Sequence, residues 1–172
     1  MSFAPKFAFW FASWATIAAV GILVPNYMPQ YFRYITISAG LFLMFYGLLL
    51  NAIAGRTLRI YGHFDIRRGI RRPEKIVKIG IYSCMRHPAQ FGSAFFGVGI
   101  ALITSNIYAI LLSGWFFSAA LYFMMAIEER ETLKIFGSEY AEFIRDRKPF
   151  TFSFKCLIRG IRALKSAHRN SG

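Results

Sequence analysis

Four apolar runs, separated by polar segments, dominate the hydropathy pattern of the chain. They cover residues 7–24, 34–55, 91–104 and 107–127. Three of these runs reach the roughly 20 residues that a helix needs to cross a hydrocarbon core. The third run is shorter, and it gains length if its helix begins at Pro88, where the missing N–H costs little. The pattern therefore predicts an all-α, polytopic membrane protein with about four transmembrane helices, the third over 88–104.

The first run is expected to be a retained helix. A single basic residue, Lys6, precedes it, and PNYMPQYF follows it instead of a small-residue cleavage site. These flanks argue against a signal peptide. The chain shows no internal repeat, and 172 residues suit one domain. We therefore predict a single membrane domain over 1–172, with two helical hairpins, a basic loop between them and a basic tail.

The basic residues lie almost entirely in two zones. Residues 56–86 hold nine Lys and Arg, residues 130–169 hold ten, and the turn at 105–106 holds none. Because cytoplasmic loops are enriched in Lys and Arg, both zones and both termini are predicted to face the cytoplasm. The net charge of +13 thus flanks apolar runs as topology demands. We therefore expect no nucleic-acid partner.

The two cysteines, Cys84 and Cys156, both lie beside basic segments on the predicted cytosolic side. Structural disulfides are rare in that compartment. We therefore expect free thiols.

Small residues recur at helical spacing in the third run, at Ser93, Gly97 and Ala101. Such spacing favours close helix packing. The alternative is that these residues clear space for a ligand.

The tail pattern predicts a basic amphipathic helix. Its apolar side holds Phe154, Leu157, Ile158, Ile161 and Leu164, and its basic residues, Lys155, Arg159, Arg162 and Lys165, fall largely elsewhere. A helix of this kind suits the anionic cytosolic leaflet, which makes anionic lipid an expected partner. A frayed, solvated end is the alternative.

Two polar segments lie at the edges of the last two runs. In EKIVKIGIYSCMRHPAQFG (74–92), Arg86 and His87 directly precede the predicted N-terminus of a helix, where free N–H groups suit an anionic ligand. In AIEERETLKIFGSEYAEF (126–143), Glu128 and Glu129 sit where the fourth run leaves the membrane, and carboxylates at that depth are costly and tend to be functional. Because runs three and four are antiparallel, both polar edges are expected to meet. Taken singly, Arg86 is interpreted as a topology anchor, His87 as a structural histidine, and the two glutamates as partners of Arg130 or nearby basic residues.

Together the two segments resemble the isoprenylcysteine carboxyl methyltransferase and phospholipid methyltransferase superfamily of membrane enzymes. The first family motif is matched at Ile76, Val77, Gly80, Tyr82, Arg86, His87, Pro88 and Gly92. The second is matched at Glu128, Glu129, Leu133, Phe136, Gly137 and Tyr140, with Phe143 in place of a final Tyr. The resemblance covers 74–143 and says little about the first two runs.

The resemblance implies S-adenosylmethionine as the methyl donor and no metal. It assigns cofactor binding to Ile76, Val77, Gly80, Tyr82, Arg86, His87, Pro88, Glu128 and Glu129. The donor itself is already activated, so the protein mainly aligns the reactants. For an amine acceptor, His87 or Glu129 is the expected catalytic proton acceptor.

Three departures from the family pattern bear on the acceptor. Glu74 stands where a His is frequent, Gln90 replaces a Tyr, and Met124 stands where carboxyl-methylating members carry an Arg. Gln90 and Met124 are therefore the expected substrate residues. Because Met cannot pair with a carboxylate as Arg does, a lipid amine or a small apolar acceptor such as a thiol is favoured over isoprenylcysteine.

Two other functions fit parts of the pattern. A nicotinamide-dependent membrane reductase shares the architecture, and a non-enzymatic basic protein would bind anionic lipid. The polar loop 62–72 lies beside the predicted site, which suggests that it closes over the site as a lid.

Overall fold

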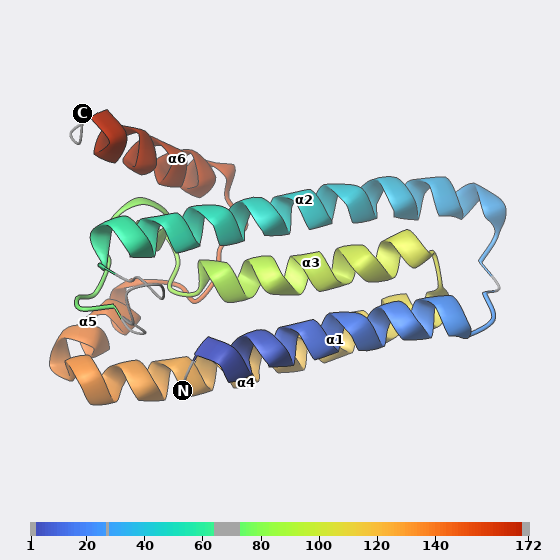
Figure 1. The fold of residues 1–172 in the computed structure, drawn as a ribbon, viewed down its shortest axis with the longest axis horizontal. Coiled ribbons are helices and arrows are strands. Elements are labelled where there is room, and N and C mark those ends of the chain that lie inside the picture. Colours follow the sequence, from blue (N-terminus) through green and yellow to red (C-terminus); the bar gives the residue numbers. More distant parts are fainter. Residues whose placement is uncertain (1–2, 27, 64–72, 170–172) are drawn as a thin grey trace. The chain divides into compact units, whose positions relative to one another are not determined.

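The computed structural model of the chain describes residues 3–26, 28–63 and 73–169. Within these ranges the chain is helical and has no strand, which confirms the predicted all-α class. The elements are α1 (Phe3–Leu23), α2 (Gln30–Tyr61), the 3-10 helix η2 (Gly80–Ser83), α3 (Pro88–Thr104), α4 (Ile107–Phe136), α5 (Ser138–Asp146) and α6 (Phe154–Arg169) (Figure 1). Residues 64–72 lie outside the described residues, so the lid remains a prediction.

Within the part of the chain that the structure describes, three helices are long and apolar enough to cross a membrane, namely α1 from Lys6, α2 and α4. The shorter apolar helix α3 has 17 residues and begins at Pro88, as the sequence predicted. Both α2 and α4 extend beyond their apolar runs, to Tyr61 and Phe136. The polar end of α4 carries part of the site described below.

Contacts divide the chain into two compact units. Unit 1 comprises Met1–Leu49 and Phe91–Met124, and unit 2 comprises Leu50–Gln90 and Met125–Gly172. The single domain over 1–172 remains a prediction.

Helix α3 contacts the three other helical segments of unit 1. Aromatic pairs join Trp14 of α1 to Phe96 of α3, with ring centroids 4.7 Å apart, and Tyr46 of α2 to Phe95, at 5.4 Å. Helix α4 joins the core through Phe117, which is 2% exposed and stacks on Trp10 of α1. A short central helix thus holds the longer ones together.

Glycines in α3 let its neighbours approach closely. A Cβ on Gly99 would lie 2.7 Å from the carbonyl oxygen of Gly40 in α2, and one on Gly97 would overlap the ring of Phe117. Ala101 is fully buried and Ser93 is buried as well. These contacts confirm that the small residues form a packing face.

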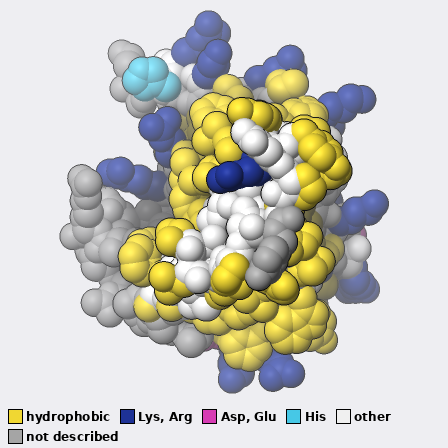
Figure 2. Space-filling model, turned by 90° about the vertical axis from the view of Figure 1, so that its right-hand side faces the viewer, with side chains coloured by type: hydrophobic (Ala, Val, Ile, Leu, Met, Phe, Trp, Pro, Cys, Tyr) yellow, Lys and Arg dark blue, Asp and Glu magenta, His cyan; other side chains and the backbone are white. Residues whose placement is uncertain are grey.

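The outer surface of unit 1 is strongly apolar. Trp115 of α4 is 73% exposed, and large apolar side chains of α1 and α2 are exposed too, among them Phe11, Ile22, Leu23 and Leu41. Figure 2 looks onto the end that holds the α1–α2 and α3–α4 connections and shows hydrophobic side chains around a more polar centre. Such an extent of exposed apolar surface is what lipid tails cover.

In unit 2, helix α6 packs against η2 and the last turns of α2. A Cβ on Gly160 would lie 2.6 Å from Ile53, and the Tyr61 hydroxyl donates to the Ala163 carbonyl at 2.8 Å. This packing brings together Cys84 and Cys156, whose Cα atoms are 5.9 Å apart, and the two form a disulfide. The expectation of free thiols is therefore wrong, because it rested on the compartment alone, whereas the docking of α6 brings together two residues that lie 72 positions apart.

Candidate functional site

The Arg86–His87 segment is held by the chain that follows α5. Met85 and Lys148 form an isolated parallel bridge. The backbone N–H of Arg86 donates to the Lys148 carbonyl at 3.1 Å, and that of His87 donates to the Pro149 carbonyl at 3.2 Å. Because Pro88 then starts α3, the two side chains project from a backbone that is fixed on both sides.

Gly80 sets the entry to this segment. Its φ of +63° lies in the left-handed region, where glycine carries no Cβ penalty. A Cβ there would also lie 3.2 Å from the Cβ of Ala163 in α6. Gly80 thus supplies both a left-handed backbone conformation and a close approach to α6.

The carboxylates come from the far end of α4. Glu128 and Glu129 lie on the part of α4 that belongs to unit 2, and each side chain is 23% exposed. Helix α4 ends at Phe136, and Gly137, with φ +54°, turns the chain into α5. The second motif therefore spans the end of α4 and the start of α5. Its buried aromatic residues, Tyr140 and Phe143, lie on α5.

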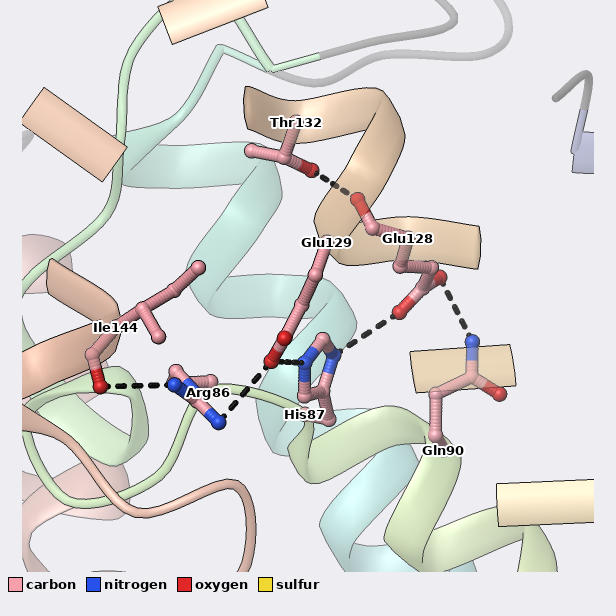
Figure 3. Close-up of polar contacts among 7 residues, drawn as sticks. All are labelled: Arg86, His87, Gln90, Glu128, Glu129, Thr132 and Ile144. Carbon is pink, nitrogen blue, oxygen red and sulfur yellow. Dashed lines mark hydrogen bonds and ion pairs between the residues drawn. The ribbon is translucent and has the colours of Figure 1, made fainter. Parts of the chain in front are cut away.

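The imidazole of His87 lies between the two carboxylates (Figure 3). Nδ1 is 3.1 Å from Oε2 of Glu128, and Nε2 is 3.0 Å from Oε1 of Glu129. Ionised carboxylates only accept hydrogen bonds, so both ring nitrogens must donate. This geometry is that of an imidazolium, sandwiched between two negative charges.

The electrostatics agree with this protonation state. Burial acts to lower the pKa of His87, but the hydrogen bonds and charges of Glu128 and Glu129 outweigh it and hold the pKa above its ordinary value. The His87 side chain is only 4% exposed. A buried charge of this kind persists because it is paired.

Arg86 completes the cluster on the side of Glu129. Its Nη2 is 3.0 Å from Oε1 of Glu129, and its Nη1 donates to the Ile144 carbonyl at 2.8 Å (Figure 3). The Nε of Arg86 is buried and has no hydrogen-bond partner among the described residues. Most buried donors in proteins have a partner, which sets this Nε apart from the other nitrogens of the Arg86 side chain.

Gln90, in the first turn of α3, holds the other carboxylate. Its Nε2 donates to Oε1 of Glu128 at 2.7 Å. Both oxygens of Glu128 thus accept a hydrogen bond, one from Gln90 and one from His87. Gln90 was predicted to contact the methyl acceptor. In the structure it is hydrogen-bonded to Glu128, the carboxylate that was predicted to bind the cofactor.

The remaining predicted cofactor residues lie in the same unit. Val77 and Tyr82 are buried, and Ile76 is half-buried. Burial raises the pKa of Tyr82 above its ordinary value. Burial, aided by the charge of Glu129, also raises the pKa of Tyr140 to about 12, so both phenols stay protonated at neutral pH.

Two predicted residues lie away from the cluster's hydrogen bonds. Met124 belongs to unit 1, where it is 1% exposed in an apolar core with Trp10 and Phe117. Arg130, the alternative partner of the glutamates, is exposed, whereas the glutamates pair with Arg86 and His87. Within the described ranges no group of three His, Cys, Asp or Glu could hold a metal ion.

Sequence reasoning missed the support of the site. Three carbonyls, those of Ile144, Lys148 and Pro149, hold Arg86 and His87, and a disulfide ties Cys84 to α6. Every residue has a backbone carbonyl, so the sequence does not indicate which carbonyls accept these hydrogen bonds. The one available signal was the odd placement of a cysteine two residues before Arg86.

A scan against protein-family models matches residues 35–139 to phospholipid methyltransferase. The match spans more than half of the chain and contains Arg86, His87, Glu128 and Glu129. With its apolar spanning helices, the protein is an integral membrane methyltransferase. The chain belongs to the phospholipid methyltransferase family, which confirms the resemblance seen in the sequence. Comparisons with curated proteins and with solved structures found no match.

Proposed function

We propose that this protein transfers a methyl group from S-adenosylmethionine to the amine of a membrane lipid, most simply a phospholipid amine. The observation that carries the proposal is the cluster of Arg86, His87, Gln90, Glu128 and Glu129. It joins the two family motifs through hydrogen bonds of 2.7–3.1 Å.

The residues present fit the donor molecule. S-adenosylmethionine carries a carboxylate, an ammonium and ribose hydroxyls. The unpartnered Nε of Arg86 suits the carboxylate, and the partly exposed Glu128 suits a hydroxyl or the ammonium. Val77 and Tyr82 add buried apolar surface for the base. When bound, this donor supplies an electrophilic methyl group on a sulfonium.

The chain's own groups then fix charge and handle a proton. Arg86 and His87 carry positive charges beside the two carboxylates, and the hydrogen bond from His87, with the charge of Arg86, holds the pKa of Glu129 below its ordinary value. A protonated amine acceptor must lose a proton before it attacks. Both nitrogens of His87 already donate to carboxylates, so the proton acceptor we assign is the carboxylate of Glu129, with His87 holding it in place.

The class of methyl acceptor is argued from the residues at positions 90 and 124. A carboxylate acceptor is recognised best by a bidentate Arg. At the position where carboxyl-methylating relatives carry that Arg, this chain has Met124, and its Gln90 is hydrogen-bonded to Glu128. An uncharged or amine-bearing acceptor with an apolar tail is therefore favoured over isoprenylcysteine.

The charge pattern supports a topology with the site and both termini on the cytosolic side. Unit 2 holds both basic zones, 56–86 and 130–169, together with the polar cluster. Donor would then enter from the cytosol and lipid acceptor from the bilayer.

Calorimetric titration of S-adenosylmethionine into the detergent-purified protein tests the donor assignment. Glu128→Gln removes one carboxylate of the cluster, and Glu142→Gln removes an exposed one on α5 as a matched control. We expect binding by the native chain and the control, and a loss of about tenfold to a hundredfold in affinity for Glu128→Gln. Equal affinities for all three would refute the site.

The acceptor is tested by methyl transfer from labelled donor. Vesicles of phosphatidylethanolamine, an isoprenylcysteine analogue and an apolar thiol serve as the three acceptors. Labelled lipid amine supports the proposal, and labelled analogue or thiol alone contradicts it. A protein that binds no S-adenosylmethionine but binds NADPH would instead be the reductase, and one that binds neither but binds anionic vesicles would be the non-enzymatic lipid binder.

A further inference from the structure

Helix α6 has three distinct faces. The first consists of small residues and packs on the protein. Cys156 is bonded to Cys84, Gly160 lies against Ile53 and Ile81, and the carbonyl of Ala163 accepts from Tyr61. This face needs no large side chain, because small residues bring the α6 backbone directly onto η2 and α2.

The second face carries the large apolar residues and is turned outward. Phe154 is 57% exposed and Ile158 is 46% exposed, and Phe152, just before the helix, is 58% exposed. Leu157, Ile161 and Leu164 are half-buried. If α6 simply lay in water, its large apolar side chains would be expected to pack against the protein. Here the small residues of α6 make that contact, so the large apolar side chains stay on the outside.

The third face is basic. Lys155, Arg159, Arg162 and Lys165 are all exposed, and α6 contains no acidic residue. The basic face lies next to the outward apolar face around the helix, since both Lys165 and Ile158 fall near Phe154 at 100° per residue. Apolar and cationic surfaces are therefore presented side by side.

Helix α6 is attached to the C-terminal part of α2, which is a candidate membrane span. Tyr61 is the last residue of α2, and Ile53 lies two turns earlier in this membrane-spanning helix. Contacts with both residues hold α6 against this part of α2. The disulfide to Cys84 fixes the first turn of α6 in addition.

We infer that α6 docks on the anionic leaflet of the bilayer that its own chain spans. Phe152, Phe154 and Ile158 enter the interface, and the four basic residues contact lipid phosphates. Charge complementarity singles out this occupant, because a purely cationic face attracts anionic headgroups and an apolar face alone would not discriminate among lipids. The inference rests on the proposed cytosolic topology of unit 2.

Hydrogen exchange of residues 154–169 in the full chain tests this docking. The protein is reconstituted in nanodiscs of phosphatidylcholine alone and of phosphatidylcholine with phosphatidylglycerol, at low and high salt. We expect slower exchange of α6 in the anionic discs, and we expect high salt to remove the difference. Arg162→Gln/Lys165→Gln should reduce the added protection by on the order of tenfold.

A matched variant separates docking from overall charge. Lys134→Gln/Arg145→Gln also removes two exposed charges, from α4 and α5, and should leave the protection of α6 intact. Equal exchange in both disc types, equal effects of the two double variants, or protection that appears only with two chains per disc would each overturn the inference. Donor titration of the same variants keeps it separate from the proposed function, because loss of α6 docking with unchanged donor affinity concerns α6 alone.

Discussion

Nε2 of His87 lies 3.0 Å from Oε1 of Glu129, and the same imidazole donates from its other nitrogen to Glu128. This relationship makes His87 a charged bridge between two neighbouring residues of α4. It therefore couples the position of the first family motif to the charge state of the second.

The bridge predicts a specific dependence of stability on pH. Because the folded-state pKa of His87 is raised above its unfolded value of about 6.5, its contribution is complete below that value and is lost as pH rises through the folded pKa. Thermal unfolding in detergent, followed from pH 6 upward, should show a decline in stability on the alkaline side. His87→Gln should lack this decline, and a native curve parallel to that of the variant would contradict the assignment.

Gln90 is predicted to position Glu128. Gln90→Ala removes the 2.7 Å hydrogen bond to a charged group, which we expect to weaken donor binding by about tenfold. Gln90→Glu should weaken it further, because a third carboxylate would then lie against Glu128. Titrations of the donor into both variants at neutral pH check this order. If Gln90→Glu binds as well as the native chain, Gln90 does not act through Glu128.

The disulfide should stabilise unit 2. A bond that closes a separation of 72 residues contributes about 4 kcal/mol in the chain-entropy description. Denaturant unfolding with and without a thiol reductant measures this difference in the native chain. The variant Cys84→Ser/Cys156→Ser should be indifferent to the reductant. Two thiols that alkylate without reduction would show that the bond is absent in solution.

Two helical glycines offer a matched pair for the packing of α6. Gly160→Ala places a Cβ 2.6 Å from Ile53, and overpacking of this kind costs about 1–3 kcal/mol. Gly114→Ala in α4 meets nothing within 4 Å, so no loss is expected there. Unfolding of the two variants should separate them clearly. An equal response would mean that α6 does not rest on α2.

The helices were predictable because their signals are local. Length and hydropathy located the spans, and Pro88 marked the start of α3. Arg86, His87, Glu128 and Glu129 could be placed together because a short antiparallel hairpin separates their motifs. The signals for these features lie within one helix or one hairpin.

The rest depends on contacts that leave no local pattern. The bridge between Met85 and Lys148 uses backbone groups, which every residue has. Cys84 and Cys156 were judged by compartment alone, and their proximity comes from the docking of α6. The sequence of α6 predicts an apolar face from its large residues. It gives no indication that Gly160 and Ala163 form the contacts with the rest of the protein.

The carbonyls of Lys148 and Pro149 have a practical consequence for protein engineering. The family match ends at residue 139, yet these two groups beyond it hold the backbone of Arg86 and His87. A chain truncated at the family boundary would keep Arg86, His87, Glu128 and Glu129, but it would lose the two carbonyls that hold the backbone of Arg86 and His87. Transplanting this chemistry into another membrane scaffold therefore requires both strips of backbone, 85–87 and 148–149, to be carried over as one piece.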